Sequence, residues 1–266
     1  MRPPPSVAGK VMAILDTFAH GDAPLTLSEI CRRAALPLAT GHRLVGELTR
    51  GGFLERLPGG SYRVGVGMWR IGAMAAPGEL RELALPYMED IYEVTHANVQ
   101  LAVRNGVKAL YVEKLRGPRS VPIVSRVGGE LPLHATGVGK ILLAFAPEEV
   151  TAEVVAAGLQ PLTRHTVTDP ARLRAALAEV RRTGVAVVRE EMTLGTCSVA
   201  APVRGAGGDV VAALSIVTTP RTDLRTFVPA LVTAAKALSR DVSGHFSTER
   251  KGNGHAGPSA QHDRPD

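Results

Sequence analysis

LPLHATGVGK, residues 131–140, is followed by the apolar run 141–145 and predicts a loop that opens into a helix. The first N–H groups of a helix have no acceptor within it and lie at its partly positive end. Such a start can hold a small anion, for example a carboxylate. It is not a nucleotide-binding P-loop, because His134 stands where the first glycine is required and Ile141 where Ser or Thr is required. Taken alone, the stretch fits a buried helix start, in which glycine permits close packing, better than an anion site. The rest of the chain is therefore needed to choose between the two.

The composition is that of an ordinary globular protein with room for two domains. The chain has 266 residues, of which 45% are hydrophobic and 21% are charged. No apolar stretch approaches the roughly 18 residues of a membrane span, and no signal-peptide core is present, so we expect a cytoplasmic protein without a membrane partner. Cys31 and Cys197 are too few for a disulfide framework or a four-ligand zinc site, and we expect neither metal nor cofactor.

Positive charge is concentrated near the N-terminus. Residues 1–76 contain nine Arg or Lys against five Asp or Glu, a net charge of +4. The remaining 190 residues contain 22 against 20. A small basic unit favours a polyanionic partner, although +4 is weak evidence by itself.

The first 66 residues have the order and length of a winged helix-turn-helix, over residues 7–66. Hydrophobic periodicity predicts three helices, over residues 7–19 (ending near Gly21), 27–34 and 39–50. Thr26 and Glu29 form a capping box at the start of the second helix. Two strand-like runs follow, around the turn Pro58-Gly59-Gly60. A small helical domain with a hairpin and no DNA partner has the same pattern, so this alternative stays open.

The rest of the chain is predicted to be α+β with a largely antiparallel sheet. A linker helix over residues 67–77 ends at Pro77-Gly78, and a second domain extends over residues 78–243. Its expected helices span residues 80–94, 138–146, 148–157, 170–183 and 222–242. Its expected strands span residues 99–103, 109–111, 121–127, 185–188, 198–203 and 210–217. Residues 247–266 are rich in Gly, Ser, Pro, His and charge and are expected to be disordered.

Short motifs from both halves, taken together, resemble the IclR family of bacterial transcriptional regulators. The N-terminal marks are Leu36-Pro37, Thr40, His42-Arg43-Leu44, Leu48, Gly52-Phe53 and Tyr62-Arg63-Val64-Gly65. The C-terminal marks are 131–137, Gly139-Lys140, Glu190-Glu191, Gly195, Cys197, 200–203 and 212–216. The resemblance implies a winged helix-turn-helix, a linker helix and a GAF-like domain that binds small organic ligands. It also implies homodimers, often paired into tetramers, on roughly palindromic operator DNA, and a ligand-responsive regulator, here expected to repress a catabolic operon.

Seven residues are expected to contact DNA: Leu38, Ala39, Thr40, His42 and Arg43 at the third helix, and Arg56 and Arg63 beside the hairpin tip. Arg43 can bond a guanine edge or a phosphate. His42 suits a phosphate contact and a packed imidazole equally well. The family often has a polar residue at position 38 and a small hydroxyl residue at position 39. With Leu38 and Ala39 at these positions, we expect the third helix to lack a side-chain N-cap and polar groups that could contact bases. The operator sequence therefore cannot be inferred from relatives.

The resemblance also implies a ligand pocket, and its residues here suggest the ligand. The expected lining is Gly137, Val138, Gly139, Val188, Met192, Cys197, Ser215 and Val217, with Leu194 as a further wall. Backbone N–H groups at 137–139 would hold a ligand carboxylate. Val188 and Val217 stand where members of the family that bind small keto-acids have an acidic residue and a hydroxyl. We therefore expect an effector with one carboxylate on an apolar or aromatic body.

Two other classes of protein remain as alternatives. Cys197 and His134 could form the thiolate–imidazole pair of an enzyme, although no third orienting group stands out. Slow, harmless alkylation of the Cys197 thiol would argue against that reaction. The helix-turn-helix could instead be only a dimerisation module, which binding of the purified protein to its upstream intergenic DNA would exclude.

Overall fold

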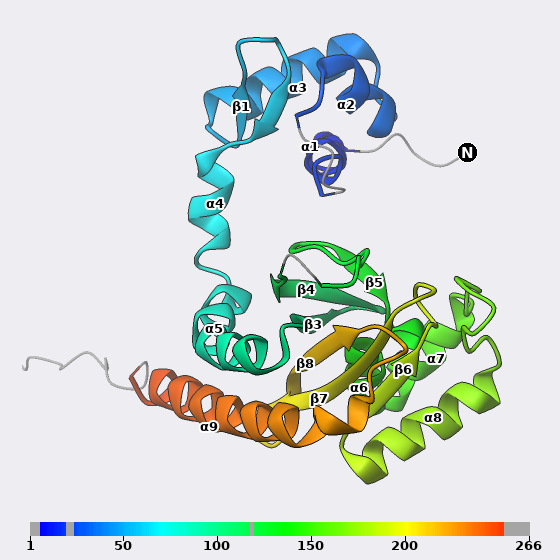
Figure 1. Ribbon diagram of the computed structural model, residues 1–266. Helices are drawn as coiled ribbons and strands as arrows, with labels where there is room; N and C mark the ends of the chain where they lie inside the picture. Colours follow the sequence, from blue (N-terminus) through cyan, green and yellow to red (C-terminus); the bar gives the residue numbers. More distant parts are fainter. Residues whose placement is uncertain (1–5, 20–23, 118–119, 253–266) are drawn as a thin grey trace, which may run out of the picture. The chain divides into compact units, whose positions relative to one another are not determined.

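The computed structural model describes residues 6–19, 24–117 and 120–252 (Figure 1). The first helix ends at Asp16, three residues before the predicted end at residue 19. Gly21 and residues 253–266 of the predicted tail lie outside these ranges. The chain divides into two compact units between Glu79 and Leu80. Within the described ranges, no helix is long and apolar enough to cross a membrane.

The first unit contains the three predicted helices, which are α1 (Val7–Asp16), α2 (Leu27–Arg33) and α3 (Leu38–Arg50). The capping box is present, because the Thr26 hydroxyl accepts from the Glu29 N–H and the Glu29 carboxylate accepts from the Thr26 N–H. The fully buried side chains of Ile14, Ile30 and Leu44 join the helices in one apolar core. Burial of these faces supplies the stability that such short helices lack by themselves.

The turn between α2 and α3 is tight for two reasons. Ala35 has a φ of 52°, a left-handed conformation that reverses the chain within a few residues. A Cβ at Gly41 would lie 2.1 Å from the Cys31 Sγ, so only glycine lets α3 approach α2 this closely. The approach fixes the crossing of the two helices and leaves one side of α3 exposed.

A short hairpin and a helix complete the first unit. Strands β1 (Leu54–Arg56) and β2 (Tyr62–Val64) pair antiparallel, with Arg56 opposite Tyr62. The linker helix is shorter than predicted, because α4 (Val66–Gly72) ends at Gly72 instead of continuing to residue 77. The N–H of Met74 donates to the Ile71 carbonyl three residues back, which closes the last turn. A new helix begins at Ala76, and Pro77 fits its first turn because no intrahelical N–H bond is required there.

The second unit is built on one antiparallel sheet of strand order β5-β4-β3-β8-β7-β6 (Figure 1). Its strands are β3 (Asn98–Asn105), β4 (Lys108–Leu115), β5 (Glu130–Pro132), β6 (Ala186–Arg189), β7 (Cys197–Arg204) and β8 (Val210–Thr218). Its helices are α5 (Ala76–Thr95), α6 (Gly137–Ala144), α7 (Glu148–Ala156), α8 (Pro170–Thr183) and α9 (Val228–Gly252). The α+β prediction is confirmed.

The two faces of this sheet are covered by different helices. Met88 of α5 and Leu238 of α9 belong to the core on one face. Ile141 of α6 and Leu177 of α8 belong to the core on the other. Because side chains alternate along a strand, neighbouring residues on the central strands contribute to opposite cores.

Two predicted segments differ from the structure. Residues 121–127 do not form a strand; β5, formed by Glu130–Pro132, pairs with β4 instead. Side chains hold this segment, since Asn98 Nδ2 donates to the Val121 carbonyl at 2.9 Å and Lys114 Nζ to the Ser125 carbonyl at 2.6 Å. At the C-terminal end, α9 continues to Gly252, beyond the predicted start of the tail at residue 247.

Candidate functional site

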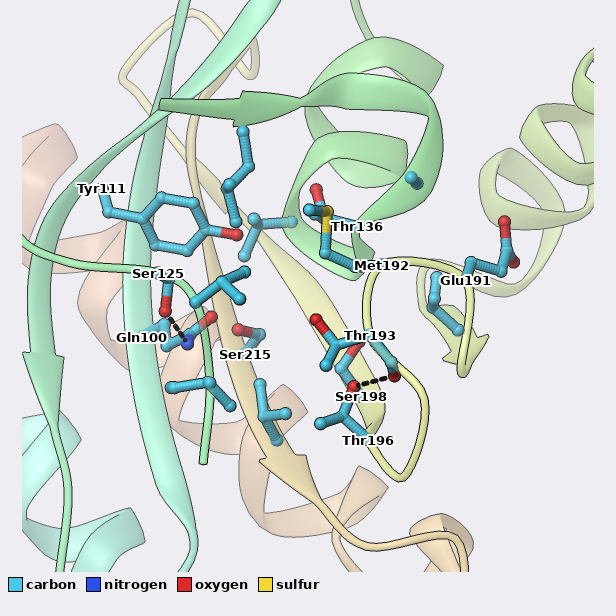
Figure 2. Close-up of a pocket in the computed structure, with 18 residues that line it drawn as sticks. Gln100, Tyr111, Ser125, Thr136, Glu191, Met192, Thr193, Thr196, Ser198 and Ser215 are labelled. Carbon is cyan, nitrogen blue, oxygen red and sulfur yellow. Dashed lines mark hydrogen bonds between the residues drawn. The ribbon is translucent and has the colours of Figure 1, made fainter. Parts of the chain in front are cut away.

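A cavity lies on the α6 side of the sheet in the second unit (Figure 2). Its floor comes from neighbouring strands, where Gln100 of β3 pairs with Ser215 of β8 and Ser215 pairs with Ala200 of β7. A second row places Val217 beside Ser198. The walls come from residues 123–125, the start of α6 and the loop after β6, so parts of the chain far apart in sequence surround one space.

The start of α6 offers two backbone N–H groups to this cavity. Thr136 is the N-cap; its hydroxyl accepts from the Gly139 N–H at 3.1 Å and its carbonyl from the Lys140 N–H at 2.9 Å. Within the described part of the chain, the N–H groups of Gly137 and Val138 have no acceptor, and both residues line the cavity. Two amides at the positive end of a helix form a site for a carboxylate.

The predicted third amide, that of Gly139, does not belong to this site. Its N–H is already bonded to Thr136. A Cβ at Gly139 would lie 2.4 Å from the Leu133 carbonyl oxygen, so the glycine is needed for close packing on the preceding turn. Gly139 therefore shapes the helix start and does not contact the cavity.

The predicted cavity residue Cys197 lies on the opposite face of the sheet. Its side chain belongs to the core under α5 and α9, and burial raises the pKa of its thiol. The neighbouring Ser198 faces the cavity, and a Cβ at Gly137 would lie 2.8 Å from its hydroxyl oxygen. A one-residue error in register reverses the face of a strand residue. Ser198 is the β7 side chain beside the two amides.

Four other predicted side chains do surround the cavity: Val188, Met192, Ser215 and Val217. Leu194 does not, because its side chain is half exposed; Thr193 and Thr196 of the same loop line the cavity instead. Val188 on β6 and Val217 on β8 flank Ser198 of β7 on the floor, one on each side.

A buried polar pair that the sequence pattern did not predict lies at the other side of the cavity. Gln100 Nε2 donates to the Ser125 hydroxyl at 2.7 Å, and both side chains are buried. Tyr111 also lines the cavity, and burial raises the pKa of its hydroxyl, so it stays protonated. Figure 2 shows Gln100 and Ser125 on one side of Ser215, with Ser198 and Thr196 on the other. The cavity therefore has two polar ends.

Behind the start of α6 lies a buried ion pair, Lys140 Nζ to Glu191 Oε1, at 2.5 Å. Glu191 belongs to the loop that forms one wall, and its side chain points away from the cavity (Figure 2). The residue before it, Glu190, has a φ of 55°, and its carboxylate accepts from the Gly195 N–H at 2.8 Å. The ion pair holds the loop after β6, residues 190–196, against α6, and the Glu190–Gly195 bond holds the loop's own shape.

The residues predicted to contact DNA are on the surface of the first unit. Leu38, Ala39, His42 and Arg43 are exposed on α3 and Thr40 is partly buried, so His42 is not a packed core imidazole. The N-cap of α3 is Pro37, which has no side-chain oxygen; position 39 is therefore inside the helix, and a hydroxyl there would not cap it. Arg43 Nη1 lies 2.8 Å from Glu47 Oε1, one turn along the exposed face.

The hairpin carries the other two predicted contacts. Arg56 is exposed at the end of β1. Arg63 donates to both carboxylate oxygens of Glu55, from Nε at 2.8 Å and Nη2 at 3.0 Å. Glu55 therefore neutralises Arg63 on this hairpin, a pairing that the sequence pattern did not predict.

Cys197 and His134 do not form a catalytic pair. His134 Nε2 lies 3.1 Å from the Gln160 carbonyl oxygen, and burial lowers the pKa of the imidazole. Cys197 lies in the core on the far face of the sheet. A buried thiol with a raised pKa is a poor nucleophile.

Comparisons with known proteins agree with this arrangement. Residues 7–58 match the family model of the "IclR helix-turn-helix domain", and residues 73–244 match that of "Bacterial transcriptional regulator IclR C-terminal". The regulator KipR of Bacillus subtilis is 32% identical over 209 residues, which is 78% of this chain and 83% of KipR. The transcriptional repressor AllR of Escherichia coli K12 is 31% identical over 208 residues, which is 77% of each chain.

Solved structures of relatives share the fold. An IclR homologue from Microbacterium hydrocarbonoxydans, complexed with 4-hydroxybenzoate, has a TM-score of 0.86 and 36% identity, covering 89% of this chain and 99% of that one. Thermotoga maritima IclR has a TM-score of 0.70 and 28% identity, covering 89% and 98%. The chain belongs to the IclR family of DNA-binding transcriptional regulators, which are not enzymes.

Proposed function

We propose that this regulator represses a catabolic operon and that its effector is an aromatic monocarboxylate. The observation that carries the proposal is that the free Gly137 and Val138 N–H groups line the same cavity as the apolar side chains of Val188 and Val217. A carboxylate would accept from the two amides and from the Ser198 hydroxyl. The body of the ligand would bury apolar area on the valines and Met192 at roughly 25 cal/mol per Å².

A small keto-acid fits these residues less well. Its second polar group would meet Val188 or Val217, neither of which can form a hydrogen bond, and burying it unpaired costs about 1–3 kcal/mol. The related protein bound to 4-hydroxybenzoate supports an aromatic ligand for this fold. Repression is supported by the name of the relative AllR, a transcriptional repressor.

We propose that the protein binds its operator as a homodimer, with a dimer of dimers as the larger assembly. Three side chains on α4 are largely exposed: Val66 at 69%, Trp69 at 71% and Ile71 at 61%. Met12 on α1 is exposed to 64%. Such apolar surface suits an isologous contact with a second copy. Two copies of α3 would then meet two half-sites of duplex DNA, and the place of action would be the cytoplasm.

The effector is tested by calorimetric titration of the full chain with benzoate, pyruvate and glyoxylate. Benzoate should bind more tightly than either keto-acid. In Gly137→Ala the added Cβ would lie 2.8 Å from the Ser198 oxygen and crowd the carboxylate site, so benzoate affinity should fall at least about tenfold. Gly244→Ala is the matched control, since its Cβ meets nothing within 4 Å. Tighter binding of pyruvate or glyoxylate would refute the proposal.

A further inference from the structure

We infer that two copies of this protein join through their second units, where an acidic side of α5 in one copy docks into a basic groove beside α9 in the other. The contact is reciprocal, so each copy contributes one helix and one groove. The inference rests on the proposed dimer of dimers and names the surfaces that hold two dimers together. It is independent of the effector cavity and of the DNA contacts.

The groove lies between three elements of the second unit. It runs along α9 from Val232 to Arg240, and β7 and the end of α8 form its other walls. Lys236 and Arg240 line it and are exposed, whereas no Asp or Glu among the described residues does so. Four residues of a helix rise about 6 Å, so the two positive charges lie one turn apart on one side of α9.

These two cations have no acidic partner of their own. Within the described part of the chain, neither Lys236 nor Arg240 forms an ion pair. Arg204 also lines the groove, but its guanidinium donates to the Gly208 carbonyl at 2.7 Å and lies over the Phe145 ring. Its charge adds to the positive potential, while Lys236 and Arg240 stay available. A groove lined by charge of one sign favours a partner of the opposite sign.

The shape of the groove suits a helix better than a strand. Gly184, Ala235 and Ser239 are small lining residues, so another backbone can approach closely. The sheet edge here is blunted, since β6 ends before this part of β7 and Pro202 has no N–H. The N–H of Arg204 is already bonded, because it donates to Ser239 Oγ at 2.9 Å. An added strand would therefore find few backbone partners.

The same unit carries a helix side with the complementary charge. Asp90 and Glu93 are exposed about one turn apart on α5, and neither forms an ion pair within the described residues. Val94, beside them, is 77% exposed and would cover the apolar lining of the groove. The spacing of the two acids along α5 resembles that of Lys236 and Arg240 along α9, so both pairs can form together.

The placement of the two surfaces allows a symmetric contact. The helices α5 and α9 lie side by side on one face of the sheet, where the Tyr87 hydroxyl donates to the Asp241 carboxylate (Figure 1). The acidic helix and the basic groove therefore flank α9 of one copy. A two-fold axis between two such copies brings each α5 to the other's groove and makes both contacts at once.

The test is sedimentation equilibrium of the full chain without DNA, at low and at high salt. The wild type should form tetramers that dissociate as salt is added, because exposed charges are screened. Lys236→Glu with Arg240→Glu should raise the dissociation constant of the tetramer at least about tenfold, since like charges then meet. Arg172→Glu with Arg225→Glu makes the same change of net charge at exposed positions outside the groove and is the matched control.

Restoring the complementary charges separates docking from a general effect of charge. Asp90→Lys with Glu93→Lys should also dissociate the tetramer. Combining these two changes with Lys236→Glu and Arg240→Glu in one chain should restore it, because opposite charges meet again. A mixture of the two double variants should restore it as well. All four positions are exposed, so each variant should keep the wild-type melting temperature.

The outcomes distinguish this contact from the larger assembly itself. A tetramer that withstands both double variants, or that the control variant weakens equally, would overturn the contact and leave the dimer of dimers intact. A loss that the fourfold variant does not recover would overturn the pairing of these two surfaces. A wild type that stays dimeric at every concentration would overturn the dimer of dimers and this inference together, and would leave the groove to an acidic segment of another protein.

Discussion

Lys140 Nζ lies 2.5 Å from Glu191 Oε1, with the two side chains only 4% and 10% exposed. The pair joins the first turns of α6 to the loop after β6, and both elements line the cavity. Glu191 also accepts from the Val167 N–H at 3.4 Å. A buried ion pair is weak evidence for stability by itself, because desolvation offsets the attraction. Its consequence here is positional: it sets the distance between two walls of the cavity.

Removing one partner of the ion pair should lower the free energy of unfolding more than removing both partners. Lys140→Met leaves a buried carboxylate without its cation and should lower the free energy of unfolding by about 3–5 kcal/mol. Lys140→Met combined with Glu191→Leu removes both charges and should recover most of that loss. Urea unfolding of the two single variants and of the double variant measures these free energies. If the losses of the two single variants add up to the loss of the double variant, the two groups do not act as a pair.

Arg43 should be the main α3 contact with operator DNA. Its ion pair with Glu47 is exposed, with 58% and 47% of the two side chains accessible, so exchanging it for a DNA contact costs little. Arg43→Ala should weaken operator binding by about 1–3 kcal/mol if the side chain contacts a base. Arg32→Ala, on the exposed end of α2, is the matched control. The measurement is titration of operator DNA with each variant at one fixed salt concentration, with footprinting of the half-sites. If Arg43→Ala and Arg32→Ala weaken binding equally, α3 is not the recognition helix.

The fold was predictable where local signals were strong. The capping box at Thr26 and Glu29 and the Asp169-Pro170 start of α8 lie where the pattern placed them. The cavity was predictable only in part. Cys197 and Ser198 are adjacent on a strand buried on both faces, and in such a strand hydrophobic alternation does not indicate which side chain faces which way.

The segment 121–127 could not be predicted from local pattern. Its Val and Ile residues favour a strand, yet Asn98, Gln100 and Lys114 hold it through side-chain bonds from residues at least eleven positions away. The Gln100–Ser125 pair was missed for the same reason. The free hydroxyl of Ser215 likewise becomes evident only once its neighbours in space are known.

The hairpin should respond to loss of the charge that neutralises Arg63. Glu55→Gln would remove the carboxylate charge and one of the two oxygens that accept from Arg63, and so would add one net positive charge to this surface. If Arg63 then contacts a phosphate, the slope of log affinity against log salt concentration should become steeper by about 0.9. Glu89→Gln, which makes the same change of charge on an exposed position of α5, is the control. If the slope changes equally in both variants, the effect comes from net charge alone and not from a phosphate contact of Arg63.

Stability should decline in mildly acidic solution because of His134. Burial lowers the pKa of its imidazole below the ordinary 6.5, and the nearby charges of Glu191 and Lys140 act in opposite directions on it. As the pH falls below about 6.5, the unfolded chain binds this proton before the folded chain does, so the free energy of unfolding falls. His134→Gln keeps an N–H donor for the Gln160 carbonyl but cannot titrate. Between pH 7.5 and 5, the melting temperature of the wild type should therefore drop more than that of His134→Gln; parallel curves would show that the histidine proton does not contribute.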